Sequence, residues 1–163
     1  TGAVMSYMNY GVKPDIVSMA KGLGGGMPIG AICATEEVSK AFTAGSHGTT
    51  FGGHPISCAA ALAEVGELLD RDLAGNAKKV GDYFAAKLEK LPHVKEVRHQ
   101  GLVGVEFDDT ISGVDVKHGC FDRKLLITAI GAHIIRMVPP LIVSEEECDK
   151  AVEIIEEAVK ALS

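Results

Sequence analysis

Residues 16–30 read IVSMAKGLGGGMPIG, a short apolar run followed by a single lysine and a glycine-rich loop. The apolar run predicts a strand over residues 16–18, and the glycines let a flat ligand approach the main chain closely. A lysine at such a place suits Schiff-base chemistry, because its amine attacks a carbonyl carbon when part of it is unprotonated. Lys21 is therefore the first candidate catalytic residue. The alternatives are a solvated loop lysine and a phosphate-binding P-loop, although a P-loop places its lysine after the glycines.

A second loop, residues 45–55, reads GSHGTTFGGHP and combines hydroxyl groups with glycines. It ends at Pro55, which is expected to be the first residue of a helix. Hydroxyls and backbone amides beside a helix start form an anion site that suits a phosphate monoester. The alternative is a turn that is rich in glycine for conformational reasons alone.

Three segments together resemble the class III pyridoxal-phosphate-dependent aminotransferases. Residues 14–31, PDIVSMAKGLGGGMPIGA, are similar to the lysine signature of that family. Residues 45–55 resemble its phosphate-contacting loop, and residues 134–141, IIRMVPPL, resemble its substrate-carboxylate segment. Two positions differ from the family pattern, His54 where asparagine is usual and His99 where a small residue is usual.

The resemblance implies roles for three residues. Lys21 would hold the cofactor, pyridoxal 5'-phosphate, as a Schiff base and then act as the general base. Thr50 would donate a hydrogen bond to the cofactor phosphate, reaching across from the partner subunit of a dimer. Arg136 would bind the α-carboxylate of the amino-acid substrate, because its planar guanidinium matches a carboxylate. From the residues alone, a surface position or a structural ion pair explains Arg136 equally well.

The fold implied by the resemblance is α/β and consists of two parts. Residues 1–74 would be the end of the large cofactor-binding domain of a fold type I transferase, and residues 75–163 a small C-terminal α+β domain. In the family, the aspartate on the pyridine nitrogen, the aromatic stacked on the ring and the phosphate cup precede the position of Thr1. We therefore expect a C-terminal portion of a longer enzyme. The alternative is a folded, non-catalytic fragment that lacks the N-terminal half of the site.

Within the family, the loop at residues 45–55 is most similar to that of enzymes that use N-acetylornithine. The resemblance then implies transfer of the terminal amino group of N-acetylornithine to 2-oxoglutarate, a step of arginine biosynthesis, by a cytoplasmic homodimer. Ornithine, succinylornithine and 4-aminobutyrate remain alternative amino donors.

Composition argues against several other classes of protein. Acidic residues outnumber basic ones by 22 to 16, so the formal net charge of −6 offers no basic field for nucleic acid. The longest apolar runs are too short to span a membrane. The six histidines are dispersed, so no metal site is expected. The cysteines form no C-x-x-C pair and are expected to be reduced thiols of a cytosolic protein; they are Cys33, Cys58, Cys120 and Cys148.

Periodicity predicts the elements of the first 74 residues. A helical turn is expected near residues 4–10. A strand over residues 31–34 has the small and apolar side chains that suit a buried sheet. Thr35 is expected to cap a short helix, and an alanine-rich helix over residues 55–71 is expected to pack closely against other elements.

The second part has a stronger helical pattern. Val80, Phe84, Leu88 and Leu91 recur at helical spacing in residues 75–91 and are expected to face a core. Ser144 and Glu147 form a capping box at the start of the last helix, residues 144–162. The other expected elements are strands over residues 94–97, 102–107, 126–128 and 133–137 and a helix over residues 114–124.

Overall fold

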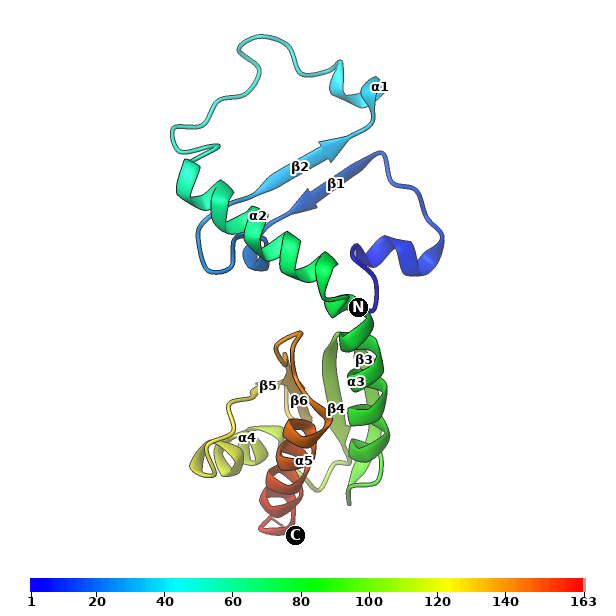
Figure 1. The fold of residues 1–163 in the computed structure, drawn as a ribbon. Helices are drawn as coiled ribbons and strands as arrows, with labels where there is room; N and C mark the ends of the chain where they lie inside the picture. The colour runs from blue at the N-terminus through cyan, green and yellow to red at the C-terminus, as the bar shows by residue number, and fades with distance from the viewer. Residues whose placement is uncertain (163) are drawn as a thin grey trace. The chain divides into compact units, whose positions relative to one another are not determined.

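The computed structural model describes residues 1–162, which form two compact units (Figure 1). The N-terminal unit comprises Val4–Asp72. The C-terminal unit comprises Thr1–Ala3 and Leu73–Ser163. Only the C-terminal unit has an extended hydrophobic core among the described residues, since every buried residue of the core cluster follows residue 79.

The N-terminal unit is built on a two-stranded antiparallel ribbon. β1 (Ile16–Met19) pairs with β2 (Ala31–Ala34), and Met19 lies opposite Ala31. A short 3-10 helix, η2 (Lys21–Gly24), follows the end of β1. The flanking elements are η1 (Ser6–Tyr10), α1 (Glu36–Ser39) and α2 (Pro55–Asp70).

Two burial predictions for this unit are wrong. β2 is mostly exposed, with Ile32 at 62%, and α2 buries only Ser57. The reason is that residues 4–72 supply no second layer over the ribbon, and α2 packs mainly against the small turn η2. Thr35 does precede α1, but its side chain makes no capping hydrogen bond.

The C-terminal unit is a four-stranded antiparallel sheet with helices on one face. Its strands lie in the order β3 (Val94–Gln100), β4 (Leu102–Phe107), β6 (Ile134–Met137), β5 (Thr128–Ile130). α3 (Leu73–Leu88) packs on β3 and β4, and α4 (Gly113–Asp122) packs on β5 and β6. α5 (Glu145–Lys160) packs against both of these helices, so the unit has one helical layer and one sheet layer (Figure 1).

The core lies between these two layers and confirms the predicted helical pattern. Val80, Phe84, Leu88 and Leu91 are each at most 8% exposed. From the sheet, alternate residues point into the same core because successive side chains of a strand face opposite sides. These sheet residues are Val103, Val105, Phe107, Ile135 and Met137. The opposite face of the sheet is therefore free of helices among the described residues.

Strand β5 begins two residues later than the sequence predicts. α4 ends at Asp122, and Lys124 then adopts a left-handed conformation with φ 70°. The amide of Leu125 donates to the carbonyl of Cys120 at 2.9 Å, which completes the helix end. Residues 124–127 therefore connect the end of α4 to β5 and are not part of the strand. Leu126 in this connection is 79% exposed.

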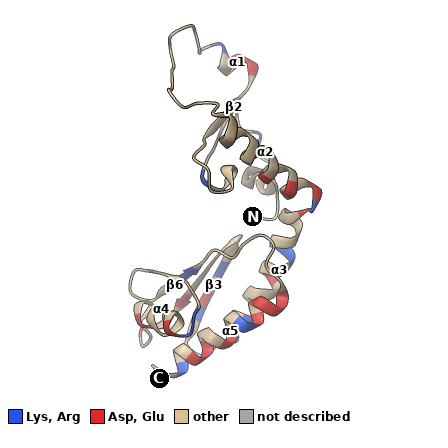
Figure 2. Ribbon diagram, turned by 60° about the vertical axis from the view of Figure 1, so that its left-hand side comes forward, with Lys and Arg blue, Asp and Glu red and all other residues tan. Residues whose placement is uncertain are grey.

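The start of α5 confirms the predicted capping box. The Ser144 hydroxyl accepts from the Glu147 amide at 3.2 Å, and the Ser144 amide donates to Glu147 Oε2 at 2.9 Å. Hydrogen bonds from Ser144 lower the pKa of the Glu147 carboxyl. Figure 2, a ribbon coloured by charge, shows that acidic positions predominate along α5.

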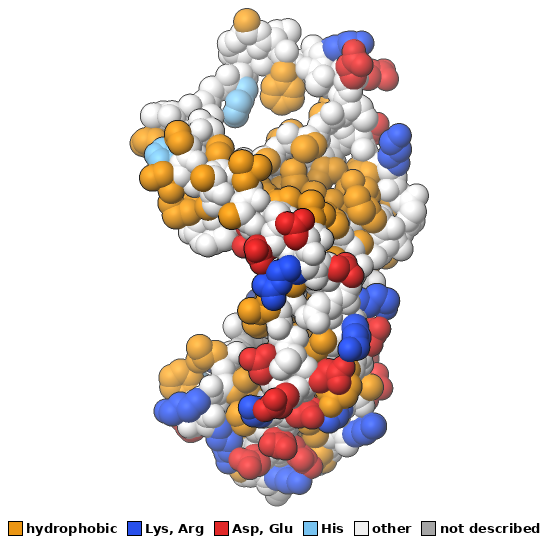
Figure 3. Space-filling model, in the orientation of Figure 1, with side chains coloured by type: hydrophobic (Ala, Val, Ile, Leu, Met, Phe, Trp, Pro, Cys, Tyr) orange, Lys and Arg blue, Asp and Glu red, His pale blue; other side chains and the backbone are white. Residues whose placement is uncertain are grey.

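The surface chemistry differs between the units. Figure 3 shows hydrophobic side chains gathered on the N-terminal unit and charged ones on the C-terminal unit. All four cysteines are free thiols. No helix within residues 1–162 is long and apolar enough to cross a membrane. The same residues contain no cluster of three or more histidine, cysteine or acidic side chains arranged to hold a metal ion.

Candidate active site

Lys21 stands at the point where β1 ends and the glycine-rich turn begins. Its φ of 56° is left-handed, a conformation that lysine rarely adopts. The side chain is exposed. Within residues 1–162, no hydrogen bond or ion pair engages its amine, although the chain has an excess of carboxylates. The structure thus presents an unpaired amine on a constrained backbone, which is typical of functional sites.

The glycines after Lys21 serve two different purposes. Gly25 has φ 55° and lies against α2, since a Cβ there would come within 3.3 Å of Glu64 Oε2. A Cβ on Gly22 or Gly26 would instead point into open space. The loop is therefore supported by α2 at Gly25 and left bare at Gly22 and Gly26, where a ligand can approach the main chain.

Thr50 lies in the exposed loop between α1 and α2. The loop is stabilised at its start by Ser46, whose hydroxyl donates to the Thr43 carbonyl at 2.8 Å. Gly52 lies against the neighbouring threonine, because a Cβ there would overlap the methyl group of Thr49. Within the described residues, no hydrogen bond engages the Thr50 hydroxyl or joins Thr50 to Lys21.

α2 begins directly after this loop, with Pro55 in its first turn. His54 occupies the N-cap position but makes no side-chain capping hydrogen bond. The first amides of the helix therefore receive no acceptor from the His54 side chain, and they carry the partial positive charge of a helix start.

Arg136 lies on β6 and points to the helix-free face of the sheet. Its neighbours in sequence, Ile135 and Met137, are buried in the core, whereas Arg136 is exposed. Thr128 on β5 is its direct cross-strand partner and donates from Oγ1 to the Arg136 carbonyl at 3.0 Å. No carboxylate within residues 1–162 pairs with the Arg136 guanidinium.

A second arginine on the same face is paired with carboxylates. Arg98 on β3 donates to Glu106 Oε2 at 3.0 Å and also contacts Glu96. Lys95 bonds the other oxygen of Glu106 at 3.3 Å. These partners lower the pKa of the Glu106 carboxyl, with the Arg98 hydrogen bond the largest cause. The nearby carboxylates are thus occupied by other cations, and Arg136 remains available to an external carboxylate.

A cluster that the sequence analysis missed joins the start of β3 to the end of β4. Asp108 accepts from the amide and the hydroxyl of Thr110, and its other oxygen lies 2.9 Å from His93 Nδ1. The Thr110 bonds, followed by the His93 contact, hold the pKa of the Asp108 carboxyl at about 2, below its ordinary 3.8. This cluster closes the ends of a hairpin. His93 lies 15 residues before Asp108, so no local motif indicates their contact.

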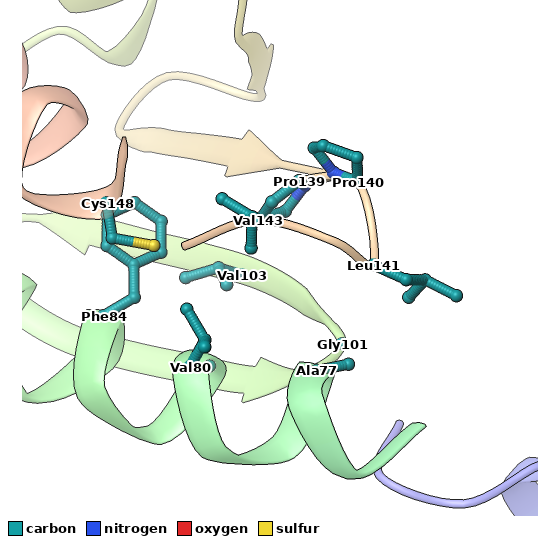
Figure 4. Close-up of a pocket in the computed structure, with 11 residues that line it drawn as sticks. Ala77, Val80, Phe84, Gly101, Val103, Pro139, Pro140, Leu141, Val143 and Cys148 are labelled. Atoms are coloured by element: carbon teal, nitrogen blue, oxygen red, sulfur yellow. The ribbon is translucent and has the colours of Figure 1, made fainter. Parts of the chain in front are cut away.

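Two apolar pockets of the C-terminal unit do not include Arg136 in their lining. The smaller, of about 20 Å³, is drawn in Figure 4, where Val80 and Phe84 of α3 point towards Val143 and Cys148. It has room for a water molecule at most. The larger, of about 270 Å³, is also lined mainly by apolar side chains. The segment 139–143 contributes to the lining of both pockets. Asn76 of α3 holds this segment by donating to the carbonyls of Leu141 at 2.7 Å and Val143 at 3.2 Å.

Comparison with known proteins gives the family. The sequence profile described as "Aminotransferase class-III" matches residues 1–159. The chain belongs to this family. Over the part of the class-III aminotransferases that it covers, the chain has their α/β fold.

Similar proteins include two named acetylornithine aminotransferase. The one from Methanothermobacter thermautotrophicus is 41% identical over 167 residues, which covers 99% of this chain and 42% of that relative. The solved structure of the one from Elizabethkingia anophelis has a TM-score of 0.89 at 32% identity and covers 99% of this chain and 42% of that chain.

A further solved structure, the ornithine aminotransferase of Toxoplasma gondii, is described with partial occupancy of pyridoxal phosphate at its active site. It has a TM-score of 0.90 at 32% identity and covers 99% of this chain and 40% of that chain. The present chain therefore spans less than half the length of these class-III relatives.

Proposed function

We propose that the protein containing this chain is a pyridoxal-phosphate-dependent aminotransferase that moves the terminal amino group of N-acetylornithine to 2-oxoglutarate. The observation that carries the proposal is Lys21, an unpaired and exposed amine held in a left-handed conformation before a bare glycine loop. Membership of the class-III family and the similarity to acetylornithine aminotransferases support the choice of reaction.

The residues around Lys21 fit this cofactor. A flat ring needs backbone without side chains, and a Cβ on Gly22 or Gly26 would fill that space. When bound, pyridoxal phosphate supplies an aldehyde for amines and a ring that accepts the electron pair from a broken bond next to nitrogen. Lys21 holds it through the ε-amine. Once released, the same amine removes a proton from the substrate carbon that bears the terminal amino group.

Thr50 binds the cofactor phosphate in this proposal. Its hydroxyl is exposed and unused, and it precedes a helix start whose amides favour negative charge. We assign this contact to Thr50 of the partner subunit in a homodimer, following the family resemblance of the loop. The free thiols of the chain agree with a cytoplasmic setting.

Arg136 binds the α-carboxylate of the amino-acid substrate. Its guanidinium offers two parallel N–H donors, which match the two oxygens of a carboxylate. Support comes from the contrast with Arg98, which is paired with Glu106 and Glu96. In domain terms, residues 1–74 belong to the cofactor-binding domain and residues 75–163 form a small α+β domain.

Ornithine is the second candidate amino donor. The observation that favours it is the TM-score of 0.90 to the ornithine aminotransferase of Toxoplasma gondii, slightly above that to the acetylornithine enzyme. The higher sequence identity to acetylornithine aminotransferases makes N-acetylornithine the first choice. Initial rates with N-acetylornithine, ornithine, succinylornithine and 4-aminobutyrate rank these donors.

The deciding experiment is the visible absorption spectrum with added pyridoxal phosphate, before and after borohydride reduction. We expect an absorption band of lysine-bound cofactor. Borohydride reduction is then expected to leave the cofactor attached permanently to Lys21, and peptide mass spectrometry identifies the modified residue. Addition of N-acetylornithine before reduction is expected to remove the band and leave Lys21 unmodified. If the chain gives no band, it is a folded fragment that does not hold cofactor by itself. Fixation at another lysine would overturn the assignment of Lys21.

A further inference from the structure

Gly104 lies beside Arg136 on the helix-free face of the sheet. It is in β4, one of the two central strands, and pairs with Arg98 of β3 on one side and Arg136 of β6 on the other. Since directly opposed residues of a sheet share a face, Arg98, Gly104, Arg136 and Thr128 form one row across all four strands.

The backbone does not require glycine at this position. Gly104 is absent from the residues with positive φ, in contrast to Gly101 in the adjacent hairpin turn, with φ 87°. Packing does not require it either. A Cβ on Gly104 would meet nothing nearer than the Arg98 carbonyl oxygen at 3.9 Å, which is an ordinary contact. A Cβ on Gly113, by comparison, would lie 2.9 Å from the backbone of Ile134.

Glycine inside a strand weakens it, and it often marks the place where a ligand approaches the backbone closely. The charges around Gly104 indicate which kind of ligand. On one side, Arg98 is neutralised by Glu96 and Glu106. On the other side, the Arg136 guanidinium has no carboxylate partner among the described residues. An anion that lies over Gly104 is therefore attracted more strongly to Arg136 than to Arg98.

We infer that Gly104 is a specificity-determining residue, whose missing side chain lets the carboxylate end of a substrate lie on the sheet against Arg136. This inference rests on the proposed function, because it takes Arg136 to be the carboxylate-binding residue. A side chain at residue 104 would stand between the ligand and the guanidinium. It would exclude carboxylates from Arg136 without disturbing the core, which lies on the other face.

The test measures glutarate binding by calorimetry in the protein that contains this chain, purified with its cofactor. Glutarate has two carboxylates and no amino or carbonyl group that reacts, so its Kd reports binding without turnover. We expect Gly104→Val to raise the Kd at least tenfold and Gly104→Ala to raise it less. Thermal unfolding midpoints of both variants should equal or exceed that of the unaltered protein, because replacing a glycine of negative φ lowers the entropy of the unfolded chain.

Thr128→Ser is the control, since it changes the side chain on the other flank of Arg136 and keeps the hydroxyl that donates to the Arg136 carbonyl. It should change the Kd less than twofold. Arg136→Ala should abolish binding. If Arg136→Ala does so but both Gly104 variants bind glutarate normally, the inference about Gly104 is overturned while the proposed function stands. If Arg136→Ala binds normally, or the unaltered protein does not bind glutarate at millimolar concentration, the role of Arg136 and the inference fail together. Should Gly104→Val unfold, Gly104→Ala decides.

Discussion

Lys21 combines an exposed, unpaired amine with a left-handed backbone conformation that is unfavourable for a residue with a Cβ. For residues with a Cβ, the left-handed region costs about 1–2 kcal/mol, because Cβ crowds the following carbonyl oxygen. A glycine at residue 21 would avoid this cost, and the next residue in the chain is a glycine. A lysine retained at a strained position indicates a requirement for its side chain.

Two substitutions at Lys21 separate chemistry from strain. Lys21→Ala and Lys21→Gly are both expected to lose transamination, because both remove the amine. Lys21→Gly is expected to have a free energy of unfolding about 1 kcal/mol above that of Lys21→Ala, because only glycine avoids the Cβ clash. Turnover assays and urea unfolding measure the two effects. A normal rate in Lys21→Ala would remove Lys21 from the mechanism.

Asp108 makes the C-terminal unit sensitive to acid. Its pKa is about 2 in the folded protein and 3.8 ordinarily, so the folded state binds fewer protons than the unfolded state. The resulting stabilisation is present above about pH 4 and is lost as the pH falls towards 2. Facing Asp108 are Thr110 and the imidazole of His93.

Asp108→Asn is therefore expected to be less stable than the unaltered protein at pH 7, and the difference should shrink between pH 4 and pH 2. Urea unfolding at several pH values measures it. Asp109→Asn, at the exposed neighbouring position, is the control and should leave the acid dependence as it is. A difference that stays constant down to pH 2 would contradict the role of the hydrogen bonds that Asp108 makes with Thr110 and His93.

At the scale of elements, helix ends decide where strands begin. The end of α4 uses residues 124–127, with Lys124 left-handed, and this moves β5 two residues beyond its predicted start. The hydrophobic run from Leu125 to Ile127 alone favours a strand there. Competition between a helix end and a strand cannot be read from periodicity, since both use the same apolar residues.

The capping box gives a quantitative prediction for α5. Ser144→Ala removes the acceptor of the Glu147 amide and should lower the free energy of unfolding by about 1 kcal/mol. Ser144→Thr keeps a hydroxyl and should recover most of that loss. Chemical denaturation of both variants at pH 7 measures the effect. Equal stability of the alanine and threonine variants would show that the hydroxyl does not contribute.

At the scale of the whole molecule, the two units differ in how they are stabilised. The C-terminal unit has a core with Leu88, Val105 and Ile155 fully buried. The N-terminal unit instead exposes large apolar side chains over its ribbon, loop and helix, as Figure 3 shows on one face. Its exposed residues include Ile16, Ile32, Phe42, Phe51, Ile56 and Leu62. Exposed apolar surface on this scale favours association.

We therefore expect the two units to behave differently as separate polypeptides. Residues 73–163 should unfold in one cooperative transition, because they contain the hydrophobic core. Residues 4–72 should show no cooperative transition and should self-associate. Circular dichroism during urea unfolding and light scattering measure both properties. A cooperative, monomeric fragment 4–72 would contradict this account of the N-terminal unit.

The sequence by itself determined most of the elements and the family. Period-3.6 and period-2 patterns are local, so α3, α5, β3 and β4 were predictable from their own residues. The signature around Lys21 is also contiguous, and the family profile confirms the resemblance. The roles of Lys21, Thr50 and Arg136 stay predictions, to be decided by the experiments above.

Only the tertiary structure decided which residues stand next to Arg136. Gly104 and Arg98 are distant from it in sequence, and their pairing depends on the strand order β3-β4-β6-β5. The same order places Glu106 against Arg98 and leaves Arg136 without a carboxylate partner among residues 1–162. Register in a sheet is set by hydrogen bonds and core packing between separate strands, and no single stretch of sequence contains that information.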